Sequence, residues 1–350
     1  MTEIITMKLT IPFVLLSINL ITSYTYAKEK IQTVQCHISS PNWANELNKV
    51  YQLDEFYVYY SDLPNSEHKI PQTADINKNT IPDYVENIAL QAKSSRDMFH
   101  LAGFRSPLKS PRYQNHATGI AIFLQNMKGN GAAFERAAQH PNIAKDMIQM
   151  PCSIALVISN NLDGFPGSWA TVTHELFHLY QYSYTQFKNS WYLESLAFWA
   201  DRSLKRENGS GTRNLPTLPQ NPTDFYKQVY KQPYTHIWRR LFLINDTDVL
   251  KIPDHMKNRI YIGGQKVFAD DEWRGTQFVL KFMQDMEKES DLITQQRDWP
   301  EYHWKENDQR LSAWNPIIFG LIQKQLQQPQ YDQTEIQFIR TVDLKSIKSE

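Results

Sequence analysis

The sequence predicts an α+β fold, in which a small twisted sheet packs on two helices and a mostly helical C-terminal domain follows. Short runs of apolar, aromatic and β-branched residues are typical of strands, and they lie at residues 55–61, 120–124 and 154–158. Apolar residues at helical spacing indicate helices at residues 84–101, 169–182, 237–243, 271–289 and 316–326. Ser168 is the expected N-cap of the second of these helices, because its hydroxyl can accept a hydrogen bond from the first turn.

The composition describes a chain long enough for two domains and without an electrostatic preference for nucleic acid. Its 350 residues include 37 acidic and 37 basic side chains, and 41% of the residues are hydrophobic. Zero net charge and the lack of a Lys/Arg-rich run argue against a nucleic-acid partner. A stretch rich in Pro, Gly, Asn and Thr leads us to expect one domain at 28–206, a linker or long loop at 207–234 and a second domain at 235–350.

Residues 1–27 are predicted to be an export signal. Lys8 gives a positive start, an apolar run follows, and Thr25 and Ala27 are small residues at the two places that determine cleavage. The alternative is an uncleaved membrane anchor, but the apolar run is short and contains two polar residues, which favours cleavage. We therefore expect a secreted or periplasmic protein without stable membrane insertion, since no later segment is apolar enough to span a bilayer.

Export gives the two cysteines a structural meaning. Cys36 and Cys152 are the only possible pair, and an oxidising compartment allows them to form one disulfide. Closing a loop of this length constrains the unfolded chain by about 4 to 5 kcal/mol if the effect is entropic. Two reduced thiols are the alternative, because the pairing follows from counting and not from geometry.

Residues 75–86 have the spacing of a calcium-binding loop. The oxygen ligands at places one, three, five, seven, nine and twelve would come from Asp75, Asn77, Asn79, the carbonyl of Ile81, Asp83 and Glu86. Thr80 occupies the sixth place, where an EF-hand requires glycine, and a β-branched residue resists a positive φ. We therefore expect a single calcium-type loop that leads into a helix. The alternative is a polar turn that only caps this helix.

The residues from 171 to 201 carry metal-binding side chains at regular spacing. His174 and His178 are four residues apart, so on a helix both imidazoles project from one face and can bind one zinc ion. Glu175 lies beside them, where a carboxylate can deprotonate a water molecule. Glu194, on the next helix, supplies a third ligand and leaves the fourth coordination position open, as in catalytic zinc sites. Asp201, two turns further on, can accept the second ring N–H of a ligand histidine. A surface helix with a chance histidine pair is the alternative.

The second of these zinc-binding helices resembles a segment of the gluzincin metalloproteases. In that family the third ligand lies in a Trp-x-x-Glu-Gly-x-Ala-like pattern, which Trp191, Glu194 and Ala197 match. Ser195 stands where glycine is common, and Phe198 occupies the place of an acidic residue in some members. The resemblance implies a zinc-dependent peptidase.

A longer resemblance runs from about residue 57 to residue 201. It combines the Asp-x-Asn-x-Asn-x-x-Pro-Asp-Tyr-Val loop, the Gly-Phe-Arg-Ser-Pro-Leu segment at 103–108, and His-Glu-x-x-His. In this combination the chain is similar to secreted bacterial metalloproteases of myxobacteria and marine species, which implies a peptide or protein substrate. In the gluzincin architecture an edge strand pairs with the substrate backbone, and the resemblance makes residues 129–134 the candidate. A disordered loop is the alternative for these residues.

The predicted chemistry is hydrolysis of peptide bonds, with Glu175 as the general base that returns its proton to the leaving nitrogen. Charge that develops on the carbonyl oxygen needs a donor besides the metal, and Tyr192 and His236 are candidates on their chemistry alone. An exposed tyrosine and a core histidine are the ordinary alternatives for these two. Two other functions stay open. One is a non-catalytic exported binding or adhesion module stabilised by zinc and calcium, against which Glu175 argues. The other is an esterase or amidase with the same chemistry.

Overall fold

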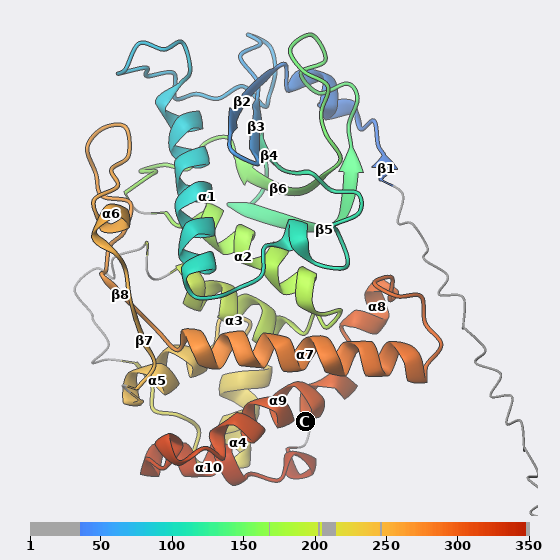
Figure 1. Cartoon of the computed structure of the whole chain (residues 1–350), viewed down its shortest axis with the longest axis vertical. Helices are drawn as coiled ribbons and strands as arrows, with labels where there is room; N and C mark the ends of the chain where they lie inside the picture. The colour runs from blue at the N-terminus through green and yellow to red at the C-terminus, as the bar shows by residue number, and fades with distance from the viewer. Residues whose placement is uncertain (1–35, 168, 202–203, 205–214, 246, 348–350) are drawn as a thin grey trace, which may run out of the picture. The chain divides into compact units, whose positions relative to one another are not determined.

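Two sheets contain all the strands of the described residues. The strands are β1 (His37–Ile38), β2 (Lys49–Leu53), β3 (Phe56–Tyr60), β4 (Gly119–Gln125), β5 (Gly131–Gln139), β6 (Ser153–Ser159), β7 (Val249–Lys251) and β8 (Glu272–Arg274). The first six form one mixed sheet in the order β1-β5-β6-β4-β3-β2 (Figure 1), and the last two form a separate pair. The expected strands are confirmed as β3, β4 and β6, and the α+β class is correct.

The computed structural model describes residues 36–167, 169–201, 204, 215–245 and 247–347. The predicted export signal, Ser168 and residues 207–214 of the predicted linker lie outside these ranges. The α-helices are α1 (Asp83–Leu101), α2 (Thr171–Tyr184), α3 (Ser190–Asp201), α4 (Pro222–Phe225), α5 (Ile237–Ile244), α6 (Asp254–Lys257), α7 (Thr276–Gln296), α8 (Glu306–Gln309), α9 (Asn315–Leu326) and α10 (Gln337–Thr341).

One helix boundary differs clearly from the prediction. The helix expected at 271–289 is α7, which begins only at Thr276 and continues to Gln296. Its expected first turn is instead β8, and Gly275 between them has a left-handed φ of 81°. A Cβ at Gly275 would lie 2.2 Å from a ring carbon of Phe242 on α5. The tertiary contact with α5 therefore requires glycine there, and helical spacing alone could not indicate it.

The two faces of the large sheet bury different sets of side chains. Successive residues of a strand point to opposite faces. Val58, Ile122 and Leu156 join the main hydrophobic cluster, which includes buried residues of α1 and α2. Their neighbours Tyr59 and Phe123 belong to a smaller cluster on the opposite face. Helices α1 and α2 therefore pack on one face of the sheet only.

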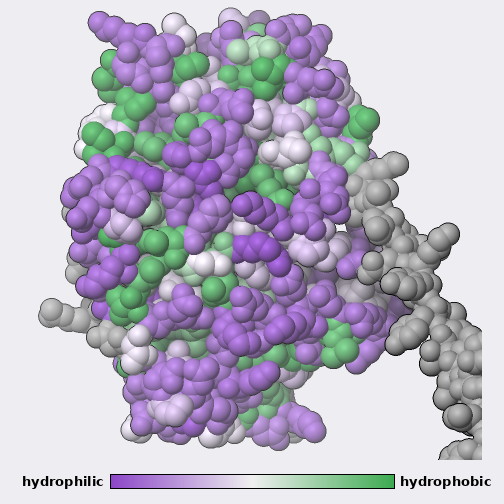
Figure 2. All heavy atoms as spheres, in the orientation of Figure 1, coloured by the Kyte–Doolittle hydropathy of each residue, from purple (hydrophilic) through white to green (hydrophobic). Residues whose placement is uncertain are grey.

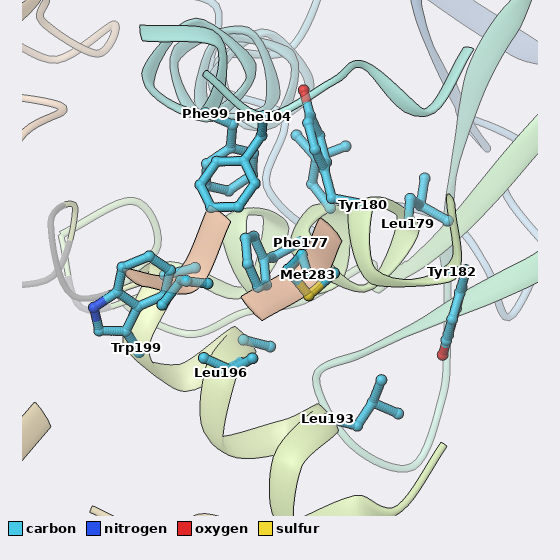
Figure 3. Close-up of a cluster of buried hydrophobic side chains, with 14 of the residues drawn as sticks. Phe99, Phe104, Phe177, Leu179, Tyr180, Tyr182, Leu193, Leu196, Trp199 and Met283 are labelled. Carbon is cyan, nitrogen blue, oxygen red and sulfur yellow. The ribbon is translucent and has the colours of Figure 1, made fainter. Parts of the chain in front are cut away.

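The sequence regions 28–206 and 235–350 share one hydrophobic core, and the described residues belong to one compact unit. Figure 3 shows part of this core, where Phe177 of α2, Trp199 of α3 and Met283 of α7 lie close together. The rings of Phe177 and Trp199 have centroids 5.9 Å apart. Residues 215–234, predicted as part of a linker, are partly helical, because they contain α4 and a π-helical turn at Tyr226–Tyr230. The division into two domains stays a prediction.

The predicted disulfide is confirmed. Cys36 and Cys152 are bonded, with their Cα atoms 5.9 Å apart, and the bond joins the chain before β1 to the residue before β6. No helix within the described ranges is both long and apolar enough to cross a membrane. Figure 2 shows mainly polar side chains on the viewed face, with apolar ones scattered among them.

Candidate metal centre

Helix α2 is fixed to α1 at its N-terminal end. Its N-cap residue, Ala170, has no capping side chain. Instead, the side-chain oxygen of Gln91 on α1 accepts a hydrogen bond from the N–H of Val172 at 3.2 Å, and its amide nitrogen donates to the carbonyl of Trp169 at 2.9 Å. Gln91 thus satisfies one of the N–H groups that a helix leaves free in its first turn.

Helix α3 is held by side chains from the C-terminal part of the chain. Ser195, which stands where the predicted pattern has glycine, accepts a hydrogen bond from Nε1 of Trp238 at 2.7 Å. Trp238 is buried, so a glycine at position 195 would leave its indole N–H without this acceptor. The side-chain oxygen of Asn315 accepts a bond from Nε1 of Trp191 at 2.8 Å. These contacts fix the helix that carries Glu194.

The three predicted metal ligands converge between α2 and α3. Nε2 of His174 lies 3.3 Å and Nε2 of His178 lies 3.6 Å from the same carboxylate oxygen of Glu194. The three ligand atoms lie within 4.8 Å of one another. Two imidazole nitrogens and a carboxylate oxygen suit a transition-metal ion, so this group could hold one. Among the described residues it is the only group of three or more His, Cys, Asp or Glu side chains whose ligand atoms lie this close together.

Outer partners orient both imidazoles toward this point. The amide nitrogen of Gln181 donates to the carbonyl of Leu193 at 2.9 Å, so its amide oxygen faces Nδ1 of His178 at 2.7 Å. That oxygen requires a proton on Nδ1 and leaves the lone pair of Nε2 toward the metal position. Asp201 has the corresponding place beside His174, with 3.5 Å between its carboxylate oxygen and Nδ1. The sequence indicated Asp201 and missed Gln181.

The charges of the centre favour a cation. Burial opposes protonation of His174, but the carboxylates of Asp201 and Glu194 outweigh it and raise the pKa of His174 to about 10. Burial also raises the pKa of Glu194, yet the two imidazoles hold it well below its ordinary value. The ionised carboxylates of Asp201 and Glu194, which stabilise a proton on His174, would also stabilise a metal cation placed among these groups. For Glu175, burial is the largest effect and raises its pKa.

Glu175 lies against strand β5. A Cβ on Gly131 would be 2.6 Å from Cγ and 2.8 Å from Oε1 of Glu175, so only glycine permits this approach. Residues 131–134 pair with β6 on one side, whereas β1 joins the other side only at Ala138 and Gln139. The segment is therefore a strand and not the disordered loop that was the alternative. Within the described residues its end next to Glu175 is a free edge.

A charged network holds the middle of β5 to the C-terminal end of α2. Nη2 of Arg112 lies 2.9 Å from the carboxylate of Glu135 on β5, and Nη1 donates to the carbonyl of Tyr182 at 2.8 Å. Nζ of Lys188 lies 3.1 Å from the same carboxylate. Burial raises the pKa of Glu135, but the two cations outweigh this effect and lower it. Because removal of one partner would leave buried charge, the network fixes the strand firmly beside the metal centre.

The two donors that the sequence suggested do not both face the centre. Tyr192 is fully buried, and its hydroxyl donates to the carbonyl of Phe187 at 2.9 Å. This hydrogen bond uses the hydroxyl proton that Tyr192 would need to donate to the carbonyl oxygen of a substrate. The expectation that Tyr192 is such a donor is therefore wrong. His236 packs on the ring of Phe198, with centroids 6.1 Å apart, and its role stays a prediction.

A different tyrosine lies at the metal centre. The ring centroid of Tyr234 is 6.4 Å from that of His174, and the side chain is 54% exposed. Burial raises the pKa of Tyr234, and the charges of Glu194 and Glu175 raise it further. A phenol that keeps its proton can donate a hydrogen bond. Sequence reasoning missed Tyr234 because it lies in the predicted linker and belongs to no motif.

The calcium-type loop brings its oxygen-bearing side chains together. The amide nitrogens of Asn77 and Asn79 donate to the two carboxylate oxygens of Glu86 at 3.0 and 2.8 Å. Asp75 accepts bonds from the N–H groups of Asn79 and Thr80 at 3.1 and 2.9 Å. Thr80 has a φ of 73°, so the sixth place adopts the left-handed conformation that a β-branched residue was expected to resist. Its N–H bond to Asp75 compensates part of that cost.

The ninth place of the loop is engaged differently. The carboxylate of Asp83 accepts a hydrogen bond from the N–H of Ile76 at 3.0 Å. Asp83 and Glu86 both lie in the first turn of α1, where a helix favours negative charge. Ile81, whose carbonyl was expected at the seventh place, donates its N–H to the side-chain oxygen of Asn79 at 2.8 Å.

Comparisons with known proteins found no matching protein-family model, no matching curated protein and no matching solved structure.

Proposed function

We propose that this chain is a zinc-dependent peptidase. One observation carries the proposal: two imidazoles and one carboxylate converge as a three-ligand set beside Glu175 and the free edge of β5. Structural zinc sites are usually closed by four protein ligands, whereas catalytic sites have three and leave room for water and substrate. Two nitrogens and one oxygen also suit zinc better than magnesium or calcium, which prefer oxygen ligands only.

Each residue of the centre has a separate task in this proposal. Zinc, when bound, polarises the scissile carbonyl and lowers the pKa of a water molecule. Glu175 accepts the proton of the attacking water and gives it to the leaving nitrogen. Tyr234 donates a hydrogen bond to the carbonyl oxygen as negative charge develops there. The free edge at 131–134 pairs with the substrate backbone and orients the scissile bond.

The main alternative is an exported binding or adhesion module that metal ions only stabilise. Such a module needs no carboxylate beside the metal and no free strand edge next to that carboxylate. Glu175 is 8% exposed and has a raised pKa because of burial, so keeping a carboxylate there costs stability. A costly group in this position is more readily explained by chemistry than by folding.

Metal analysis and a broad peptide screen on the protein without residues 1–27 test the proposal. We expect one zinc per chain and peptide turnover in the parent. Glu175→Gln should keep zinc, because Glu175 is not a ligand, and should lose turnover by at least about 100-fold. Glu289→Gln on α7 is the matched control and should behave as the parent. Equal turnover by Glu175→Gln and the parent would exclude Glu175 as the base.

We also propose that the loop at 75–86 binds calcium. The side-chain amides of Asn77 and Asn79 both bond to the carboxylate of Glu86, and the carboxylate of Asp75 accepts a bond from the backbone N–H of Asn79. Rotation of the two amides would present their oxygens to a cation in place of their nitrogens. Calcium added to metal-stripped protein that has been reloaded with zinc should raise Tm, and Asp75→Ala should abolish this rise. An unchanged Tm in the parent would exclude the calcium site.

We propose that the mature chain acts outside the cytoplasm. The disulfide between Cys36 and Cys152 is compatible with an oxidising compartment, and the predicted signal precedes it in the sequence. Mass spectrometry of the exported protein should find Lys28 as the first residue. Protein recovered only from the cytoplasmic fraction, with Met1 intact, would contradict this proposal.

A further inference from the structure

A cavity of about 320 Å³ lies between the predicted linker and α5. Leu218 forms part of its wall and is buried, Lys227 and Gln228 come from the π-helical turn, and Ile237 and Arg240 come from α5. This volume lies at the lower end of the range for small-ligand pockets. The cavity therefore suits one side chain of a larger ligand better than a separate cofactor.

The cavity borders the metal centre through two of its lining residues. Tyr234 lines the cavity, and its ring centroid is 6.4 Å from that of His174. His236 also lines it. Phe198, one turn after Glu194 on α3, packs on both of these rings with centroids 6.1 Å apart in each case. A chain held at the metal ligands can therefore extend one side chain past Tyr234 into the cavity.

The charge of the lining is positive. Arg240 and Lys227 line the cavity, and no aspartate or glutamate is among its described lining residues. Arg240 is neutralised, because its Nε and Nη2 donate to Glu335 at 2.8 and 2.6 Å. Glu335 also accepts a hydrogen bond from the N–H of Leu218 at 2.7 Å, so it links Arg240 to Leu218 without lining the cavity itself. Lys227 has no carboxylate partner in the part of the chain that the structure describes, and its charge is left for a ligand.

We propose that this cavity binds a carboxylate of the peptide substrate, so that the chain prefers acidic peptides. The proposal rests on the proposed peptidase function for the place of the substrate, but its chemistry comes from the cavity alone. Lys227 supplies the attraction, the amides of Gln228 and Gln232 can donate hydrogen bonds, and Leu218 packs on the methylene groups. The carboxylate comes either from an Asp or Glu side chain or from the C-terminus of the peptide.

Binding measurements on zinc-loaded Glu175→Gln test the cavity without turnover. The probes are fluorescent decapeptides that carry Glu, Gln or Ala at one position at a time, each with a free or an amidated C-terminus. We expect one position at which Glu binds about fivefold more tightly than Gln, as a partly exposed charge pair allows. If the C-terminus is the source, amidation and not the Glu-to-Gln change will weaken binding by this factor.

Two further variants decide whether Lys227 is responsible. Lys227→Glu in the Glu175→Gln background should reverse the preference, so that the peptide with the amide binds more tightly than the peptide with the carboxylate. Lys231→Glu adds the same charge at the end of the same turn, outside the cavity, and should leave the preference unchanged. Three outcomes would each overturn the proposal: failure of every peptide to bind, an affinity that changes neither with the Glu-to-Gln replacement nor with C-terminal amidation, or an unchanged preference in Lys227→Glu.

The two proposals, that the cavity binds a carboxylate and that the protein is a peptidase, can be refuted separately. A parent protein that hydrolyses peptides without any acidic preference retains the peptidase function and refutes the cavity. A parent that binds acidic peptides through Lys227 but hydrolyses none retains the cavity and refutes the peptidase. Turnover by the parent should follow the same preference as binding to Glu175→Gln, since the cavity acts on substrate binding.

Discussion

Gly131→Ala should disable the centre without touching a metal ligand. Gly131 lies on β5 in an ordinary extended conformation, so alanine is acceptable to the backbone there. The new methyl group would, however, lie 2.6 Å from Cγ and 2.8 Å from Oε1 of Glu175. Carbon atoms that are not bonded normally stay about 3.5 to 4.0 Å apart. Either the carboxylate or the strand must therefore move by about 1 Å.

The strand is the harder of the two to move. It is paired with β6 along residues 131–134, and Glu135 further along is held by Arg112 and Lys188. We therefore expect the side chain of Glu175 to swing away from the metal ligands. A misplacement of about 1 Å at a reacting group can reduce the rate by about 100-fold. Overpacking of this kind should also reduce the free energy of unfolding by about 1 to 3 kcal/mol.

The measurement compares kcat/KM on a peptide found in the screen with the zinc content of the same sample. We expect a loss of about 100-fold in kcat/KM and one zinc per chain. Gly320→Ala on α9 is the matched control, because a Cβ there meets no atom within 4 Å. It should keep parent activity and raise the free energy of unfolding by about 0.5 to 1 kcal/mol. Parent activity in Gly131→Ala would refute the close approach of β5 to Glu175, and loss of zinc would place the damage at the ligands.

Three further changes test the surroundings of the centre. Gln181→Ala removes the acceptor of Nδ1 of His178 and should weaken zinc binding by about 10- to 100-fold in a chelator competition; unchanged affinity would contradict the orienting role. Replacing Cys36 and Cys152 together by serine should lower the free energy of unfolding in urea by about 4 to 5 kcal/mol, whereas an unchanged midpoint would mean that the bond does not constrain the unfolded chain. Asp291→Asn tests a pH effect, because burial and the charges of Glu287 and Glu301 raise the pKa of Asp291 from 3.8 to about 6. A carboxyl with a raised folded-state pKa contributes stability at low pH that is lost as the pH rises through this window. The asparagine variant should therefore lack that loss and be more stable than the parent at pH 7, by about 1 kcal/mol after allowance for solvent screening. If the free energy of unfolding depended equally on pH in the parent and in Asp291→Asn, Asp291 would not be the source of the effect.

The parts of the site that lie close together in the sequence could be predicted. His174 and His178 share one helix face by spacing alone, and Glu194 follows on the next helix, so local geometry nearly determines their convergence. The strands β3, β4 and β6 were also predictable, because their apolar runs are buried in the sheet. The same is true of α1, whose observed start at Asp83 is one residue before the expected one.

The parts that depend on packing between distant segments could not be predicted. Tyr234 reaches His174 because Phe198 packs on its ring, and no spacing rule relates a tyrosine in a predicted linker to a helix of the site. Tyr192 was a candidate on its chemistry alone, and its hydroxyl donates to the carbonyl of Phe187 in the core. A residue's neighbours in sequence say little about the direction of its hydroxyl when two helices cross.

Gly131 shows why the free edge of β5 and the metal ligands should be considered as one unit. The strand approaches Glu175 so closely that any side chain at position 131 would occupy the place of the carboxylate. A fold that needed β5 only to complete its sheet would gain from a larger residue there, since glycine weakens a strand. The close approach is useful only if something must lie against the strand edge and the carboxylate at the same time. Under the proposed function, a peptide backbone paired with residues 131–134 would meet this requirement, because the edge that holds it begins next to the carboxylate of Glu175.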